Sequence, residues 1–351
     1  MSEKLSAQQR ANLFAMSTRQ NLQMLAKQTV TTPSTSVQFT LPKARLLSNI
    51  FVKIKAKVKV THASNTEIKT TALTPYRLIR RFSLDLNNGF SPYSISGDGL
   101  ALLNMIQPNA NMIMDKSAYF DCPETFKASA AGTENELSFT VQLPVTLNQR
   151  DPVGLILLQS EQTVTDLRLD IGNPVEMFTE GAEGYTIDLV SMEILPMLET
   201  FSIPANGNAF PDLSVLKLCQ DRTDTLTSAG QQIIKLSTGT IYRKLILFIT
   251  DENGNPASAD FVASNLELVF NQADCNYSIN AEMLRAKNAF DLGHELPAGV
   301  FIFDFSNQGF PNYSGTRDYI DSERLTEFWV RFNTTGKGKV KIVSECLARL
   351  V

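Results

Sequence analysis

The stretch YRLIRRFSLDLNNGFSP at Tyr76–Pro92 returns later in the chain as YRKLILFITDENGNP at Tyr242–Pro256. Each stretch is rich in apolar residues and then runs into an Asn/Gly turn, a pattern typical of a β-strand that ends in a tight turn. The repeat predicts that one β domain is built twice. Five residues coincide without a gap: Tyr76, Arg77, Phe82, Asp85 and Asn87 fall on Tyr242, Arg243, Phe248, Asp251 and Asn253.

Two further matches extend the repeat toward the end of the chain. DLRLDI at Asp166–Ile171 parallels EFWVRF at Glu327–Phe332, and LVSMEILPML at Leu189–Leu198 parallels IVSECLARLV at Ile342–Val351. The three matches keep the same order along the chain, as a duplication requires. They predict a first domain at residues 37–198 and a second domain at residues 199–351, after a separate segment at residues 1–36.

Composition narrows the class of protein. The chain has 351 residues, which suits two domains that each bury a core. Its formal net charge of −4 leaves no overall basic field that would hold nucleic acid. The N-terminus lacks the apolar core of a secretory signal, and no apolar run is long enough to predict a transmembrane helix. The four cysteines are far apart, so we expect free thiols in a reducing cytoplasm.

The N-terminal segment differs from everything after it. Ser6 and Gln9 resemble a capping box, and apolar residues then recur at helical spacing through Leu25. The spacing predicts an amphipathic, mildly basic helix over residues 1–30, followed by a linker in which Pro33 stops the helix. Two roles remain open for this helix: it packs on its own domain, or it contacts a membrane surface or a neighbouring subunit.

After residue 36 the hydrophobic period changes to that of β-strands. Apolar residues alternate with Lys53, Lys55, Lys57 and Lys59, which predicts a strand with one apolar face and one lysine face. We interpret the lysine face as a solvated or subunit-facing surface that also discourages edge-to-edge aggregation. Many short strands with turns between them favour an all-β fold of two tandem eight-stranded jelly rolls. Short helices are expected in both copies, at Leu100–Ile106 and Ala281–Phe290.

A search for catalytic and metal-binding motifs finds no convincing site. His62 and His294 have no neighbours at metal-ligand spacing. The calcium-loop pattern that starts at Asp251 fails, because Pro256 stands where glycine is required. No phosphate-binding glycine loop and no nucleophile elbow occur in the sequence. We therefore expect a protein that is not an enzyme, with no cofactor-binding and no metal-binding residues.

The layout of the chain resembles that of the major capsid proteins of tectiviruses, icosahedral bacteriophages with a membrane inside the protein shell. The resemblance rests on SAQQRANLFAMSTRQNLQMLAKQTV at Ser6–Val30, the Pro-marked linker and the duplicated strands behind it. It covers essentially the full length as a layout, although the individual motifs are weak. It implies a double jelly roll with a short N-terminal amphipathic helix, and no catalytic site.

The resemblance also implies how the protein assembles. It implies a homotrimer that forms a pseudo-hexagonal capsomer, with neighbouring capsomers and penton or minor capsid proteins as partners. The protein would be made and assembled in the host cytoplasm, would end in the virion capsid, and would bind no nucleic acid sequence-specifically. The N-terminal helix would face lipids of the inner membrane through seven side chains: Lys4, Arg10, Phe14, Arg19, Leu22, Leu25 and Lys27.

Two other classes of function compete with a capsid role. A two-domain β-sandwich protein that binds or cleaves carbohydrate is the main alternative, but it would usually show a secretion signal and clustered exposed aromatic residues. A pore-forming or membrane-remodelling protein could use the N-terminal helix, but the sequence shows no long amphipathic hairpin that would span a bilayer.

Overall fold

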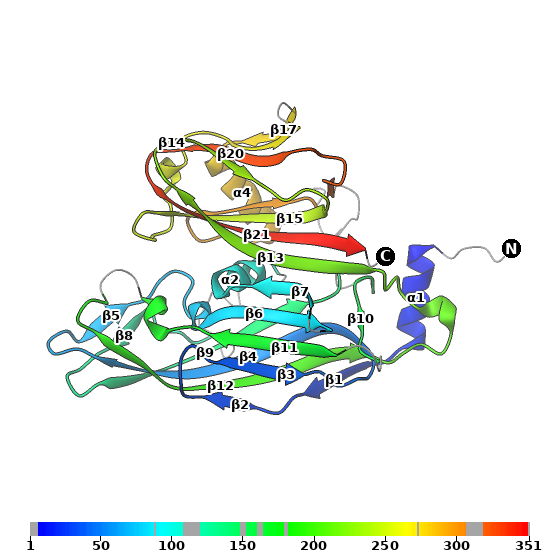
Figure 1. Ribbon diagram of the computed structural model, residues 1–351, viewed down its shortest axis with the longest axis horizontal. Coiled ribbons are helices and arrows are strands. Elements are labelled where there is room, and N and C mark those ends of the chain that lie inside the picture. The colour runs from blue at the N-terminus through cyan, green and yellow to red at the C-terminus, as the bar shows by residue number, and fades with distance from the viewer. Residues whose placement is uncertain are drawn as a thin grey trace.

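The structure is a computed structural model, shown in Figure 1. It describes residues 6–87, 89–107, 120–147, 152–159, 164–178, 182–271, 274–306 and 319–349. Two β-sandwiches are stacked on each other, and helix α1 (Ala7–Ser17) stands at one end of the lower sandwich. Within the described residues, no helix is long and apolar enough to span a membrane.

The first sandwich follows the connectivity of a jelly roll. Strands β1 and β2 share the position of the first strand of the roll, so its two sheets have the orders β1/β2–β12–β4–β9 and β3–β11–β6–β7. Short strands β5 (Glu67–Lys69), β8 (Thr125–Lys127) and β10 (Ile156–Leu157) add to this frame. The main strands are β1 (Gln20–Met24), β2 (Gln28–Val30), β3 (Ser36–Thr40), β4 (Leu46–Thr61), β6 (Ile79–Leu86), β7 (Phe90–Ile95), β9 (Thr133–Pro144), β11 (Thr165–Ile171) and β12 (Thr186–Phe201).

The second sandwich repeats this connectivity. Its sheets have the orders β13–β21–β15–β18 and β14–β20–β16–β17, so in both rolls the first strand neighbours the last and the second neighbours the seventh. A short strand, β19 (Ile320–Asp321), pairs with β15. The predicted fold of two tandem jelly rolls is therefore confirmed. The main strands are β13 (Val215–Leu226), β14 (Gly230–Lys235), β15 (Ile241–Asp251), β16 (Leu266–Phe270), β17 (Asp274–Ile279), β18 (Val300–Asp304), β20 (Phe328–Thr334) and β21 (Gly338–Arg349).

Among the described residues, each roll has one α-helix between its fifth and sixth strands. Helix α2 (Gly97–Met105) follows β7, and helix α4 (Ala281–Leu292) follows β17. Ser96 and Asn280 cap them, because each side chain accepts hydrogen bonds from backbone N–H groups of the first turn. The helices lie where the sequence predicted them. Single-turn 3₁₀ helices occur at η1 (Tyr76–Leu78), η2 (Pro174–Met177), η3 (Gly207–Ala209) and η4 (Ala259–Phe261).

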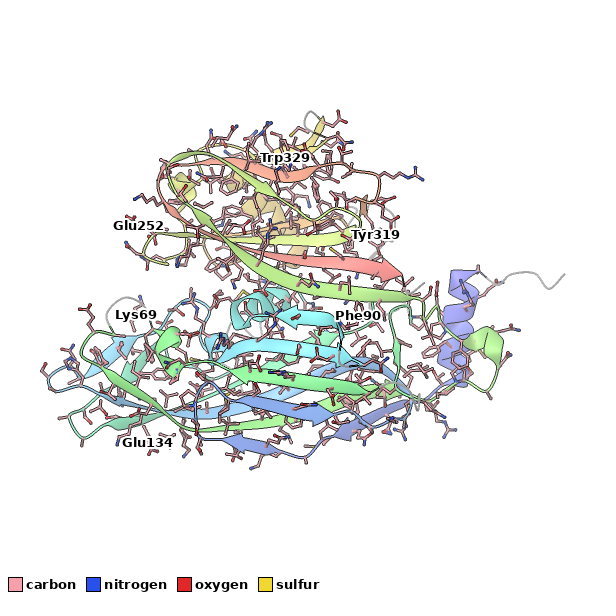
Figure 2. All side chains as sticks on the ribbon, viewed as in Figure 1. Lys69, Phe90, Glu134, Glu252, Tyr319 and Trp329 are labelled. Atoms are coloured by element: carbon pink, nitrogen blue, oxygen red, sulfur yellow. The ribbon has the colours of Figure 1, made fainter. Side chains whose placement is uncertain are left out.

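Strand β4 shows why the lysine pattern produces this fold. Its apolar residues other than Phe51 are buried, and Lys55 and Lys57 are exposed on the opposite face. Acidic residues on the neighbouring strands face these lysines: Lys57 lies opposite Glu136 of β9, and their side chains form a 2.7 Å ion pair. Lys59 likewise lies opposite Glu134, which Figure 2 places at the outer side of the first roll. The predicted lysine face is present, and acids balance its charge.

The opening sequence match joins strands that are not equivalent. Tyr76–Pro92 covers η1, β6 and the start of β7, the fourth and fifth strands of the first roll. Tyr242–Pro256 covers β15, the third strand of the second roll, whose counterpart is β4. The similarity is local: both stretches contain a strand that runs into an Asn/Gly turn. The other two matches join equivalent strands, β11 with β20 and β12 with β21.

The N-terminal helix is shorter than the sequence spacing predicts. It ends at Ser17, and residues 20–30 form β1 and β2, which pair with β12. Thr18 closes the helix, since its backbone N–H and its side chain both bond the carbonyl of Phe14. The helical spacing of Leu22 and Leu25 is therefore coincidental. The boundaries at residues 36 and 198 remain predictions.

The two rolls share one continuous sheet. Strand β13 of the second roll pairs in parallel with β7 of the first roll, with Cys219 opposite Tyr93 and Gln220 opposite Ser94. The buried cluster that fills the first roll also takes in residues of the second roll, among them Ile246, Ile302 and Val343. The outer face of the sheet β13–β21–β15–β18 is therefore part of the junction between the rolls.

Candidate interface surfaces

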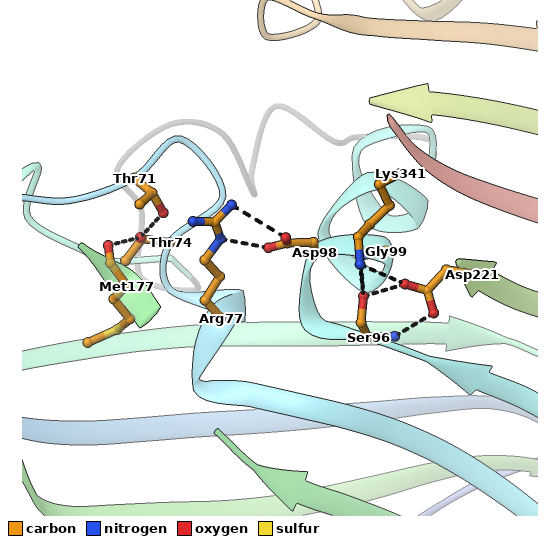
Figure 3. Close-up of polar contacts among 9 residues, drawn as sticks. All are labelled: Thr71, Thr74, Arg77, Ser96, Asp98, Gly99, Met177, Asp221 and Lys341. Atoms are coloured by element: carbon orange, nitrogen blue, oxygen red, sulfur yellow. Dashed lines mark hydrogen bonds and ion pairs between the residues drawn. The ribbon is translucent and has the colours of Figure 1, made fainter. Parts of the chain in front are cut away.

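Helix α2 begins in a polar contact between the rolls (Figure 3). The Ser96 backbone N–H donates to the Asp221 carboxylate at 2.9 Å, and its hydroxyl donates to the same carboxylate. Lys341 Nζ reaches both Ser96 Oγ, at 2.8 Å, and Asp221 Oδ2, at 3.1 Å. Asp221 and Lys341 belong to the second roll, so this cluster fixes the helix of one roll on the sheet of the other.

A pocket of about 390 Å³ opens beside this cluster. Its cationic side chains are Arg77, Arg80 and Lys341, and its acidic side chains are Asp98 and Glu176. Arg77 already pairs with Asp98 at 2.8 Å, and Lys341 pairs with Asp221. Because two of its three cations are paired with acids, we regard the pocket as part of the polar joint rather than as a ligand site.

A buried charged group lies deeper in the junction. Glu345 accepts a 2.7 Å hydrogen bond from Arg243 and lies 3.9 Å from Lys217 Nζ, and all three side chains are at most 5% exposed. Burial tends to raise the pKa of Glu345, but the positive charges of Lys217 and Arg243 outweigh it and hold this pKa below its ordinary value. Burial lowers the pKa of Lys217. Lys217 Nζ and the Tyr93 hydroxyl both donate to the Pro144 carbonyl, which ties β13 to the first roll.

The N-terminal segment packs on the end of the first roll. The Phe14 ring meets the Phe201 ring edge to face at 5.3 Å, and Phe14 clusters with buried Leu46 and Leu155. The Arg19 backbone N–H donates to the Ser202 hydroxyl at 3.0 Å. These contacts hold α1 on its own domain, which is one of the two roles that the sequence left open.

The predicted membrane-facing residues differ in how far they are exposed. Arg10 and Arg19 are exposed, and Leu22 is exposed on β1. Phe14 is only 4% exposed, so this side chain could reach lipid only if α1 left its site. Leu25 packs partly on the core, and Lys27 pairs with Glu193 at 3.0 Å. Lys4 lies outside the described residues.

The structure brings out a repeat that the sequence analysis missed. The pattern Tyr-Ser-Ile, then Leu, then Asn runs from Tyr93 to Asn104 in the first roll and from Tyr277 to Asn288 in the second. Both stretches cover the fifth strand and the following helix, and in both rolls the fourth strand pairs with it in the same register: Leu84 lies opposite Tyr93, and Leu268 opposite Tyr277.

The two asparagines of this repeat make the same contacts. Each is buried. Each side-chain amide makes two hydrogen bonds to one residue of the sixth strand: it donates to the backbone carbonyl of that residue and accepts from its backbone N–H. We call this pair of bonds the asparagine bracket. Asn104 does so with Gln142 of β9, at 3.1 and 2.8 Å. Asn288 does so with Ile302 of β18, at 2.9 Å for both bonds. A search for spaced pairs rather than contiguous similarity would have found this signal.

Five of the eight exposed large apolar side chains among the described residues lie in two segments of the chain. One group lies at the N-terminal end, on α1 and β1: Met16, Leu22 and Met24. The other lies on α4, where Met283 and Phe290 are seven residues apart and so share one face of the helix. Exposed apolar groups of this kind mark candidate contact surfaces. Among the described residues, no group of three or more metal-ligating side chains occurs.

Comparisons with known proteins agree with the topology. No protein-family model matches the sequence, and no curated protein matches it. Among solved structures, the chain is similar to the major capsid protein of Sulfolobus turreted icosahedral virus (STIV), with a TM-score of 0.70, 16% identity, and coverage of 94% of this chain and 97% of that one. For the capsid protein of the virus PBCV-1, the TM-score is 0.63 at 11% identity, covering 94% of each chain.

A phage capsid protein shares the same architecture. The major capsid protein P2 of bacteriophage PM2 matches with a TM-score of 0.57 and 11% identity, covering 95% of this chain and 98% of that one. The carbohydrate-binding alternative gains no support from these matches. Over almost its whole length, the chain has the double jelly-roll fold found in major capsid proteins of icosahedral viruses.

Proposed function

We propose that the chain is the major capsid protein of an icosahedral phage and forms trimeric, pseudo-hexagonal capsomers. The observation that carries this proposal is the double jelly roll, which matches the STIV and PM2 major capsid proteins along nearly their full length as well as its own. The charged pairs at the roll junction are explained as structural contacts, and they need no catalytic role.

The internal duplication supplies the physical reason for a trimer. The two rolls have the same connectivity, so three chains would present six similar units around one axis. A head-to-tail contact closes into a ring when its rotation divides a full turn. Neighbouring capsomers and penton or minor capsid proteins would be the partners of the assembled shell.

Oligomeric state and particle formation test this proposal. We expect light scattering coupled to size exclusion to give three times the mass of one chain, and electron microscopy to show plates with a pseudo-hexagonal outline. We expect the trimers to persist on dilution to micromolar concentration. A protein that stays monomeric at all concentrations and builds no shell would contradict the proposed function.

We further propose that the shell encloses a membrane and that the N-terminal segment faces it. The exposed cations Arg10 and Arg19 suit anionic headgroups. The structure changes how this is tested, because deleting residues 1–30 would also remove β1 and β2 from the sheet. The better variant is Arg10→Glu with Arg19→Glu, which leaves both strands in place.

Vesicle flotation measures this contact. With vesicles that contain anionic lipid, we expect the double variant to lose most binding in low salt, while Lys69→Glu with Lys235→Glu, two exposed lysines elsewhere, keeps it. Equal flotation of both variants would remove the membrane role and leave the capsid proposal untouched.

A further inference from the structure

Within one chain, the first roll covers the outer sheet face of the second roll. The equivalent sheet face of the first roll is not covered by the described part of the same chain. The two rolls can be aligned residue by residue, because Asn104 and Asn288 mark Gln142 and Ile302 as equivalent positions. Cross-strand partners then define one row across each outer sheet face. In the second roll this row is Asp221, Val343, Ile246 and Ile302. In the first roll it is Met24, Met197, Phe51 and Gln142.

A second landmark supports this alignment. In each roll the third strand carries a bulge directly beside a glutamate of the last strand. Glu199 lies opposite Asn49, and the register then skips Ser48. Glu345 lies opposite Lys244, and the register then skips Arg243. The bulges and the asparagine brackets come from different strands and give the same alignment.

The two rows differ in what covers them. Val343, Ile246 and Ile302 of the second roll are at most 4% exposed, because the first roll lies against them. In the first roll, Met24 is 63% exposed, and Met197 and Phe51 are only partly buried. Three adjacent strands thus present an apolar row that the same chain does not cover.

The elements of the first roll that cover the row in the second roll also have equivalents in the second roll, and these equivalents are exposed. Strand β7 and helix α2 of the first roll make the cover, through the β13 pairing and the Ser96–Asp221 contact. Their equivalents are β17, which is the edge strand of its sheet, and α4. Met283 on α4 is 62% exposed and Phe290 is 86% exposed. A pocket of about 330 Å³, lined in part by Tyr277 and Phe303, opens at this flank.

We propose that the β17–α4 flank of one chain docks on the row Met24–Met197–Phe51 of a second copy, in the way that β7 and α2 dock on the second roll within one chain. The contact is head to tail, so each chain uses both surfaces, one toward each neighbour. This inference rests on the proposed self-assembly and names the surfaces that carry it.

The alignment predicts which residues meet. Met283 is equivalent to Gly99 of α2, because both lie five residues before the bracketing asparagine. A Cβ atom placed on Gly99 would lie 3.1 Å from Asp221 Oδ2. This helix position therefore faces Asp221, the first residue of the row in the second roll. The equivalent of Asp221 in the first roll is Met24. Met283 of one copy is therefore placed against Met24 of the next, where two flexible apolar side chains suit each other.

A charge swap in the full-length protein tests the pairing. Met24→Lys and Met283→Glu should each raise the dissociation constant of the oligomer by at least about tenfold, because each buries a lone charge at an apolar contact. The double variant should restore association to within about threefold of the original, since the introduced ammonium group of one chain then meets the introduced carboxylate of the next. Within one chain the first roll lies between β1 and α4 (Figure 1), so rescue must act between chains.

Matched controls carry the same new charges elsewhere. Val175→Lys and Ile233→Glu change exposed apolar residues outside both surfaces and should leave association unchanged. Sedimentation velocity gives the dissociation constants, and circular dichroism confirms folding. Trimers that tolerate both single variants, or a double variant that is no better than the singles, would overturn the proposed contact while leaving the capsid role intact. If the unsubstituted protein stays monomeric at all concentrations, both the proposed contact and the proposed capsid role are overturned.

Discussion

At the residue scale, Glu345 is the group on which the roll junction depends most. It is the anion between Arg243 and Lys217, and water reaches none of the three side chains to any extent. A buried ion pair contributes little net free energy, but removing one partner leaves the other charges buried and uncompensated.

Glu345→Gln should therefore lower the free energy of unfolding by about 3–5 kcal/mol, because two buried cations lose their counter-charge. Denaturant unfolding followed by fluorescence measures this loss. The control is Glu267→Gln, which breaks the partly exposed ion pair with Arg331 and should cost less than about 1 kcal/mol. Similar losses for both variants would show that the buried group does not hold the junction.

The same residue predicts how stability depends on pH. The pKa of Glu345 is lower in the folded protein than its ordinary value, so the unfolded chain binds its proton more readily. The stabilisation is present above the ordinary glutamate pKa of about 4.3 and is lost as the pH falls through the lower folded value. Melting temperatures between pH 6 and pH 3 should fall more steeply for the original protein than for Glu345→Gln. Parallel curves would contradict this assignment.

At the element scale, hydrogen bonds fix the helix between the fifth and sixth strands to the sixth strand in each roll. Asn288 holds α4 to β18 through both hydrogen bonds of Ile302, and Asn104 does the same for α2. Asn288→Ala should cost about 1–3 kcal/mol of stability, because the backbone groups of Ile302 lose their partners where water is scarce. Asn208→Ala, at an exposed position in η3, should change stability by less than about 0.5 kcal/mol in the same thermal unfolding assay. Equal effects would mean that α4 does not need the bracket.

The elements also show what could be predicted from the sequence and what could not. Alternation predicted β4, β11 and β20, since each buries one face and leaves most of the other less buried. An apolar strand that runs into an Asn/Gly turn occurs in both rolls at different positions, and this is why the Tyr76 match found a strand ending and not an equivalent position. The sequence predicts a helix for residues 20–30, because the spacing of their apolar residues fits the period of an α-helix as well as that of a β-strand. Pairing with β12, about 170 residues away, decided between them.

The candidate surfaces were harder to predict. Met24 and Met283 belong to no recognisable sequence motif. Their exposure can be seen only once the positions of the strands and helices are known. The excess of cationic residues in the N-terminal segment can be read directly from the sequence, and their role at a membrane remains a prediction.

At the scale of the whole molecule, the rolls should unfold together. The buried cluster of the first roll includes the outer face of the second roll, and the sheet is continuous through β7 and β13. Separating the rolls would expose Val343, Ile246 and Ile302 to water, at a cost of about 25 cal/mol for each Å² of apolar surface. Calorimetry should show one cooperative transition, with calorimetric and van't Hoff enthalpies that agree. Two separated transitions would show that the junction is weak.

The pairing of Cys219 with Tyr93 has a practical consequence for following how the two rolls of one chain separate. Burial raises the pKa of the Cys219 thiol well above its ordinary value, so in the closed chain this sulfur is neither accessible nor nucleophilic. A thiol-specific dye should label it only in chains whose rolls have come apart. The rate at which Cys219 is labelled would then measure how fast the two rolls separate in solution.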